Sequence, residues 1–182
     1  MLELSVFAVA SAGIVAISWT SLANPRAHGF YRFFAFESIL ALVVLNARQW
    51  FSHPFAVRQI LSWMLLAASA ALAAHGFHLL RVVGKPEGRV ENTTRLVRVG
   101  AYRHIRHPLY CALLLLGLGA LLKGPSLVSG GVALVMVGAL IATARAEEAE
   151  NLAKFGDAYA AYMKDTRMFL PFPGSRAAGR ER

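Results

Sequence analysis

Long apolar stretches separated by short polar segments run through the first three quarters of the chain. A helix needs roughly 20 mostly apolar residues to cross a hydrocarbon core of about 30 Å. Four stretches suit this length: residues 4–22, 30–47, 60–80 and 127–143. A fifth, residues 109–122, is apolar but short, and it begins directly after Pro108. The pattern predicts an all-α, polytopic membrane protein with about five transmembrane helices, in which the fifth stretch is either a short span or a re-entrant segment.

The last two apolar stretches predict a C-terminal helical hairpin, because only the turn at residues 123–126, Lys-Gly-Pro-Ser, separates them. The second stretch should leave the membrane at Arg145, continue as a polar helix and end near Gly156, and another cytoplasmic helical stretch should follow. We divide the chain into a three-helix scaffold at 1–82, a loop, hairpin and C-terminal region at 83–173, and a disordered basic tail at 174–182. The first stretch is read as a true helix and not a signal peptide, because no Lys or Arg precedes Arg26.

Composition and charge sharpen this picture. The chain is 57% hydrophobic and only 16% charged, with a net charge of +9. In a soluble protein that charge would suggest binding to nucleic acid. In a membrane protein it indicates the orientation of the chain, because cytoplasmic segments carry the Lys/Arg excess. Five spans leave six flanking segments. The N-terminus and the second and fourth loops hold three of the 19 basic residues, and the first and third loops and the C-terminal segment hold sixteen. We therefore expect an inner-membrane protein with its N-terminus outside and its C-terminus in the cytoplasm, whose partner is the lipid bilayer and not nucleic acid.

Candidate chemistry gathers at the cytoplasmic end of the hairpin. His104, His107 and Tyr110 lie where its first helix begins, and Glu147 and Glu148 lie where its second helix leaves the membrane. Since a hairpin returns the chain to the same face, these groups should lie at a similar height and could hold a polar ligand above an apolar chamber. The alternative is that the basic side chains anchor a helix end at lipid headgroups and the glutamates are solvated.

Two further features of the sequence bear on binding. Glu37 lies within the second apolar stretch, where a charge costs roughly 2.5–3.5 kcal/mol on insertion scales and usually faces a bundle interior. We hypothesise that Glu37 pairs with His75, either as a stabilising pair or as part of a site. The single cysteine, Cys111, excludes an internal disulfide and a cysteine-cluster metal site, and no metal is expected.

The C-terminal half carries an ordered series of motifs. They read Gly100-x-Tyr102-x-x-x-Arg106-His107-Pro108-x-Tyr110, then Glu147-Glu148-x-x-x-Leu152-x-x-Phe155-Gly156-x-x-Tyr159-x-x-Tyr162, and finally Phe169-Leu170-Pro171. Over residues 96–171 this series resembles the isoprenylcysteine carboxyl methyltransferase family of membrane enzymes and its relatives, the phospholipid methyltransferases.

The resemblance implies an enzyme that transfers methyl from S-adenosylmethionine to a lipid-like or small amphiphilic acceptor. It implies that eight residues bind the cofactor: Leu96, Val97, Tyr102, His107, Pro108, Leu109, Tyr110 and Glu147. An acceptor that arrives with a proton needs a general base, for which Glu148 and His104 are the candidates. We assign Arg106, Arg145 and Glu37 to acceptor binding.

One position departs from the pattern of the prenylcysteine enzymes. These enzymes carry an arginine, which helps to hold the substrate carboxylate, four positions before the first cofactor-binding glutamate, and Thr143 stands there in this chain. The acceptor therefore stays open among prenylated thiol compounds, phospholipid amines and other amphiphiles. Two alternatives to a methyltransferase are a nicotinamide-dependent membrane reductase of the sterol reductase type and a non-catalytic membrane scaffold.

Overall fold

The computed structural model describes residues 2–86 and 93–169, and in this part of the chain every regular element is a helix, with no strand. The predicted all-α class is thereby confirmed. The predicted tail at 174–182 lies outside the described residues, as do residues 87–92 of the long loop and Leu170 and Pro171 of the last motif. The helices are α1 (Leu2–Leu22), α2 (His28–Leu45), α3 (Val57–Val82), α4 (Pro108–Lys123), α5 (Leu127–Phe155) and α6 (Asp157–Asp165), with single 3-10 turns η1 (Ala47–Gln49) and η2 (Gly100–Arg103).

Four of these helices, α1, α2, α3 and α5, are long and apolar enough to cross a membrane. Their outer surfaces expose large apolar side chains, among them Val9 at 75%, Leu4 at 72% and Leu134 at 75% exposure. Such a surface suits a membrane-embedded protein, because lipid and not water then covers it. Helix α4 has 16 residues, which span roughly 24 Å at about 1.5 Å per residue. It is thus shorter than the other four, as the sequence predicted.

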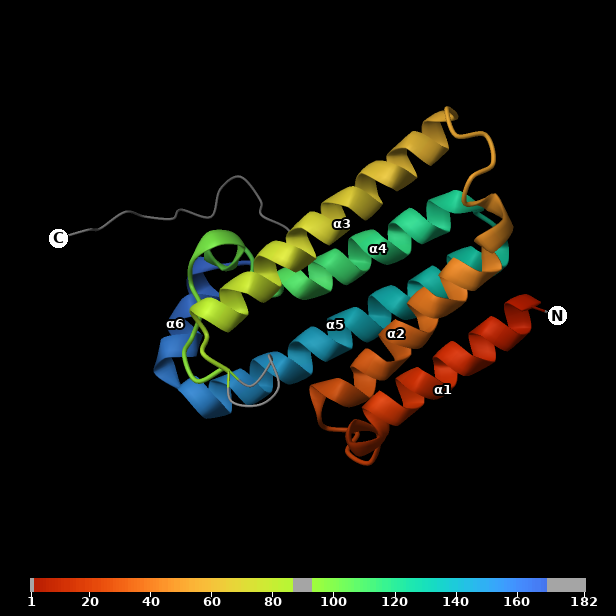
Figure 1. The fold of residues 1–182 in the computed structure, drawn as a ribbon. Helices are drawn as coiled ribbons and strands as arrows, with labels where there is room; N and C mark the ends of the chain where they lie inside the picture. Colours follow the sequence, from red (N-terminus) through yellow and green to blue (C-terminus); the bar gives the residue numbers. More distant parts are fainter. Residues whose placement is uncertain (1, 87–92, 170–182) are drawn as a thin grey trace.

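The five long helices lie side by side in one bundle (Figure 1). Helix α3 packs along α4, α2 packs along α5, and α1 covers α2 at the edge. Helix α6, η2 and the beginning of α4 gather at one end of the bundle, and the N-terminus lies at the other. The predicted hairpin is present, since α4 and α5 pack against each other. Helices α2 and α3 do not pack closely along each other.

The α3–α4 contact is close because small and hydroxyl residues form it. Ser62 and Ser69 of α3 donate hydrogen bonds of 2.7 Å to the carbonyl oxygens of Gly119 and Ala112 in α4. A Cβ on Gly119 would lie 2.9 Å from the side chain of Leu66. Small residues at helix interfaces favour this kind of packing in membranes.

A buried lysine lies at the end of the bundle opposite α6. Lys123 ends α4 with its side chain fully buried, and its Nζ donates to Oε1 of Gln59 at 3.0 Å. The ammonium group lies 3.6 Å from the ring centroid of Trp63 and 5.3 Å from that of Trp50. The sequence placed Lys123 in a connecting loop, but the two indole rings and the amide enclose it.

The hypothesis that Glu37 pairs with His75 is wrong. Both carboxylate oxygens of Glu37 accept hydrogen bonds from the Ser11 hydroxyl of α1 at 3.0 Å. His75 instead lies near η2, where its Nε2 accepts a hydrogen bond from the backbone N–H of Ala101 at 3.4 Å. Only the expected depth below one membrane face had matched the two residues, whereas α2 packs against α1, α4 and α5, and α3 packs mainly against α4.

Candidate functional site

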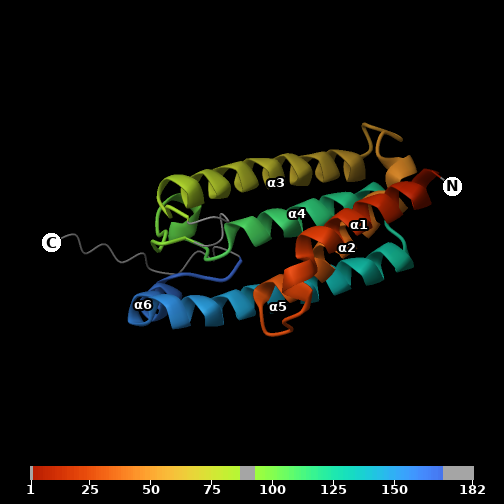
Figure 2. The same ribbon diagram turned by 60° about the horizontal axis from the view of Figure 1, so that its bottom comes forward.

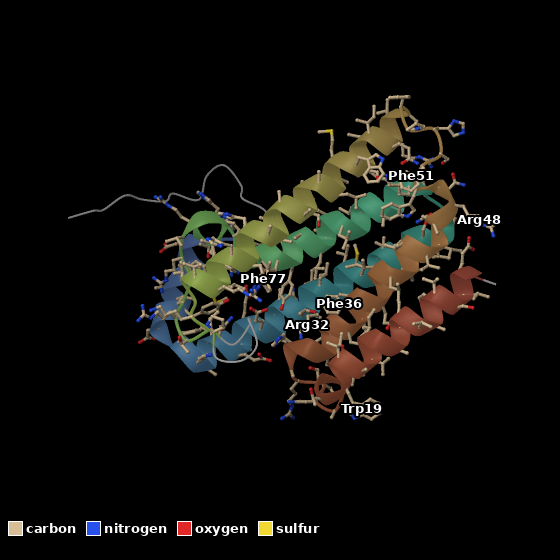
Figure 3. All side chains as sticks on the ribbon, in the orientation of Figure 1. Trp19, Arg32, Phe36, Arg48, Phe51 and Phe77 are labelled. Atoms are coloured by element: carbon tan, nitrogen blue, oxygen red, sulfur yellow. The ribbon has the colours of Figure 1, made fainter. Side chains whose placement is uncertain are left out.

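A cavity of about 650 Å³ lies at the bundle end that carries α6. This volume is within the range of roughly 300–1,000 Å³ that is usual for small-molecule sites. Residues of α2 and α3 line its two sides, and residues of α1, α4, α5, α6 and the loop after α3 complete the wall. Figure 3 labels Phe77 of α3 and Arg32 and Phe36 of α2, which line this same cavity from two helices that do not pack on each other.

The part of the cavity near α6 is polar. The polar residues that line it come from the loop, the first turn of α4, the end of α5 and α6: Tyr102, Arg106, His107, Tyr110, Glu147, Asn151, Tyr159 and Tyr162. On α5, Glu147 and Asn151 are four residues apart, so they share one face of the helix with Phe155, which also lines the cavity. This end therefore offers a carboxylate, an amide, an imidazole and several phenols to a single ligand.

His107 and Tyr110 hold Glu147 at the cavity wall. The two rings stack at a centroid distance of 5.3 Å with 15° between their planes. The hydroxyl of Tyr110 donates a hydrogen bond to Oε2 of Glu147, and Nδ1 of His107 lies 4.0 Å from the same oxygen. Because Tyr110 and His107 restrict its carboxylate, Glu147 presents an acceptor in a fixed position, although its side chain is 29% exposed.

Directly beside Glu147, Glu148 forms a buried network. Its Oε1 accepts from Nε of Arg106 at 2.7 Å and lies 3.2 Å from Nε2 of His107. The side chains of Arg106 and Glu148 are both only 9% exposed. The Arg106 guanidinium also donates to the carbonyl oxygens of Met163 and Thr166. Glu148 therefore neutralises Arg106 and orients His107, while the other face of His107 remains at the cavity.

The segment after α6 returns to the beginning of α4. The backbone N–H groups of Arg106 and His107 donate to the carbonyl oxygens of Arg167 at 2.7 Å and Met168 at 3.3 Å. Sγ of Cys111 donates to the carbonyl oxygen of Phe169 at 2.9 Å. We call residues 166–169 the C-terminal strap, since they fasten α6 to the turn that carries Arg106 and His107.

Three buried phenols keep their protons at the cavity. Burial, and then the nearby Glu147 carboxylate, raises the pKa of Tyr102 well above its usual value. Burial likewise raises the pKa of Tyr159 and of Tyr162. The Tyr162 hydroxyl donates to the backbone oxygen of Tyr102 at 2.6 Å. These rings thus act as neutral groups that stack and donate hydrogen bonds.

Gly100 allows the loop to reach the cavity. Its φ is +57°, a conformation that side chains rarely adopt, and an added Cβ would lie 2.6 Å from Nε2 of His75. The turn that follows buries Tyr102 and Ile105. Gly100 therefore permits the close approach of the loop to α3 that places Tyr102 in the wall.

Away from α6, the cavity becomes apolar. Phe36 of α2, Ala73 and Phe77 of α3, and Leu113 and Leu116 of α4 line this part. Arg32 also lines it, with its guanidinium carbon 5.8 Å from the centroid of the Phe36 ring. A single cavity thus joins a polar end to an apolar end that lies between membrane-length helices.

The structure brings most of the predicted cofactor residues to this cavity. Those that line it are Leu96, Val97, Tyr102, His107, Leu109, Tyr110 and Glu147, and Arg106 lines it as well. Pro108 does not line it and is buried in the first turn of α4. The two parts at 1–82 and 83–173 share the cavity, since α2 and α3 supply part of its wall.

Besides Pro108, four predicted site residues lie elsewhere. Glu148 does not line the cavity, and its engagement with Arg106 and His107 argues against its predicted role as a base. His104 is exposed beyond the wall, Arg145 lies in a separate groove, and Glu37 contacts α1. These positions give no support to the catalytic role predicted for His104 or the acceptor-binding roles predicted for Arg145 and Glu37.

Several residues that line the cavity were not predicted from the sequence. Asn151 lies four residues after Glu147 and four before Phe155, a helical spacing that could have identified it. Tyr159 and Tyr162 stood in the motif but were given no role. Arg32, Phe36 and Phe77 had no signal in the sequence, because only the order of helix packing brings them together.

Comparison of the chain with models of protein families, with curated proteins and with solved structures finds no match.

Proposed function

We propose that the protein is a membrane-embedded methyltransferase that binds S-adenosylmethionine and methylates a lipid-like or small amphiphilic acceptor. In this proposal the five long helices all span the cytoplasmic membrane, α4 as a short span. The polar end of the cavity faces the cytoplasm. The cofactor reaches it from water, and the acceptor reaches the apolar end from the bilayer.

One observation carries the proposal: seven of the eight residues that the family resemblance assigns to the cofactor line one cavity together. They come from the loop, α4 and α5, and up to about 50 residues separate them in the sequence. The resemblance rested on the order and spacing of the motifs across an expected membrane hairpin. Six of the seven lie within residues 96–110, so the convergence that supports the proposal is that α5 brings Glu147 to the same cavity.

The chemistry of the polar end suits the proposed cofactor. S-adenosylmethionine carries an aromatic base, ribose hydroxyls, a zwitterionic amino-acid group and a sulfonium cation, and it supplies a methyl group that is activated for transfer. Glu147 can accept hydrogen bonds from ribose hydroxyls or an ammonium group, and Asn151 can both donate and accept. Neutral tyrosine rings can stack on an aromatic base or face a cation.

The residues of the cavity would act mainly by positioning and by excluding water. The Arg106–Glu148 pair and the stacked Tyr110 ring fix His107, so the wall keeps its shape when a ligand binds. Such preorganisation lowers the barrier by orienting the reactants. With Glu148 bound to Arg106, the cavity favours an acceptor that arrives without a proton, such as a carboxylate or thiolate, because that acceptor requires no base.

The position of Thr143 limits which residues of the cavity could bind the acceptor. Thr143 is fully buried, and its hydroxyl donates to the Ala139 carbonyl of the same helix at 2.7 Å. It therefore offers nothing to a ligand in the cavity. Arg32 and Arg106 are the cationic residues among the described part of the chain that line the cavity, and Arg106 is already neutralised by Glu148.

The first prediction tests cofactor binding with S-adenosylhomocysteine, the product of methyl transfer. We expect saturable binding to the detergent-purified protein by calorimetric titration. Glu147→Gln should weaken it roughly 10- to 100-fold, because hydrogen bonds to charged groups contribute about 1.5–3 kcal/mol.

The matched control is Glu150→Gln, which removes the same charge from the same helix. Glu150 pairs with His28 outside the cavity, so this variant should bind like the wild type. Equal weakening in both variants, or no binding to folded wild-type protein, would contradict the proposal. In the second case a titration with reduced nicotinamide dinucleotide would test the reductase alternative.

A further inference from the structure

A second groove, of about 460 Å³, lies on the outside of the bundle. It runs between the connection of α1 to α2 and the outer face of α5, which lie next to each other in Figure 2. Pro25, Arg26 and Tyr31 line one side, and α5 lines the other with residues from Gly138 to Ala146. The groove shares no lining residue with the cavity.

The end of the groove toward α6 is strongly basic. Arg26 and Arg145 both line it and both are exposed. No acidic residue of the described chain lines the groove. Glu150, the acidic residue one turn beyond Arg145, is bound by His28 through Nδ1 at 2.6 Å and the backbone N–H at 2.9 Å. Two guanidinium groups therefore face the groove from two different elements without a carboxylate between them.

The same contact makes the groove a fixed structure. The His28–Glu150 pair joins the first residue of α2 to α5. It thereby holds the connection that carries Arg26 against the helix that carries Arg145. The two arginines line one groove, so a single ligand in it can contact both.

The rest of the groove is apolar. Its floor on α5 consists of Gly138, Ile141 and Ala142. A Cβ added to Gly138 would meet nothing within 4 Å, so there is open space against the helix at this position. Gly138 precedes Arg145 by about two helical turns, or roughly 10 Å. Along the axis of a spanning helix, a lipid tail would thus lie on the floor while its headgroup lies at the arginines.

We propose that this groove binds one anionic phospholipid. Its phosphate lies between Arg26 and Arg145, the Tyr31 hydroxyl contacts the headgroup, and one acyl chain lies along Gly138, Ile141 and Ala142. Guanidinium groups match phosphate oxygens in geometry and charge. The order of basic and apolar residues also matches the orientation of a lipid in the cytoplasmic leaflet, where anionic lipids attract Lys and Arg.

The test measures thermal unfolding of the detergent-purified protein while phosphatidylglycerol or phosphatidylcholine is added. Phosphatidylglycerol should raise the unfolding temperature of the wild type more than phosphatidylcholine does. In Arg26→Gln/Arg145→Gln its half-saturating concentration should rise about 30-fold, since each basic group near an anionic surface contributes a factor of about 5. The charge-matched control Arg103→Gln/Lys164→Gln, at exposed positions, should respond like the wild type.

Gly138→Leu tests the apolar floor separately. A Cβ added at Gly138 meets nothing within 4 Å, so we expect the variant to fold, and the leucine should weaken the response to phosphatidylglycerol. The proposal is overturned by equal shifts with both lipids, by an unchanged response in the double arginine variant or in Gly138→Leu, or by a full shift with glycerol 3-phosphate alone. The last result would mean a simple anion site.

Discussion

At the scale of single residues, the adjacent carboxylates Glu147 and Glu148 have different roles because neighbouring residues on a helix point in different directions. Glu147 faces the cavity and Glu148 faces the beginning of α4, where Arg106 and His107 bind it. The sequence predicted both glutamates at the same end of the hairpin, but which of them lines the cavity depends on the rotation of α5.

The second prediction concerns Glu148→Gln. The change leaves the Arg106 guanidinium, in a side chain only 9% exposed, without its counter-charge. Breaking a buried pair typically costs about 3–5 kcal/mol. We expect a loss of this order in the free energy of unfolding, measured in mixed detergent micelles.

Glu150→Gln is again the control for that measurement. The side chain of Glu150 is 43% exposed, and exposed pairs contribute at most about 1 kcal/mol. If Glu148→Gln were no more destabilising than Glu150→Gln, the network would not hold the site in the way described.

At the scale of elements, the sequence largely predicted where the helices begin and end, but it did not predict which helices pack against each other. Apolar length identified α1, α2, α3 and α5, and Pro108 and Gly156 marked helix ends correctly. The Glu37–His75 pairing failed because the sequence does not tell which helices adjoin. For the same reason the cavity residues of the loop and α5 could be predicted from motifs, whereas Phe36 and Phe77 could not.

The third prediction tests the close α3–α4 contact with two glycine substitutions. Gly119→Ala places a Cβ 2.9 Å from Leu66 and 3.3 Å from the Ser62 carbonyl oxygen. Overpacking of this kind costs about 1–3 kcal/mol, so the unfolding free energy should fall.

Gly130→Ala in α5 provides the comparison. Nothing lies within 4 Å of its added Cβ, and alanine is favoured over glycine in helices by up to about 1 kcal/mol. This variant should be neutral or more stable in the same unfolding measurement. Equal destabilisation of both variants would show that helix packing does not distinguish the two positions.

At the scale of the whole molecule, the proposed topology places the cavity's polar end in the cytoplasm. The fourth prediction tests it with single cysteines in a Cys111→Ser background, labelled in intact cells by a membrane-impermeant maleimide. Phe55→Cys, at a position 90% exposed before α3, should react. Lys154→Cys, exposed near the end of α5, should react only after the cells are opened.

Serine at position 111 keeps a donor for the Phe169 carbonyl oxygen, which the Cys111 thiol now contacts at 2.9 Å. The background variant should therefore fold and remain unlabelled. Labelling of Lys154→Cys and protection of Phe55→Cys in intact cells would reverse the proposed orientation and place the polar end outside.

The C-terminal strap has a consequence for the order in which the protein matures. Ribosomes make the chain from the N-terminus, and early segments fold first. All five long helices are complete at Phe155, yet the carbonyl oxygens that hold Arg106 and His107 belong to residues 163–168. During synthesis, helices α1 to α5 are therefore made before the residues that hold Arg106 and His107, and the polar end of the cavity is fastened only when these last turns follow.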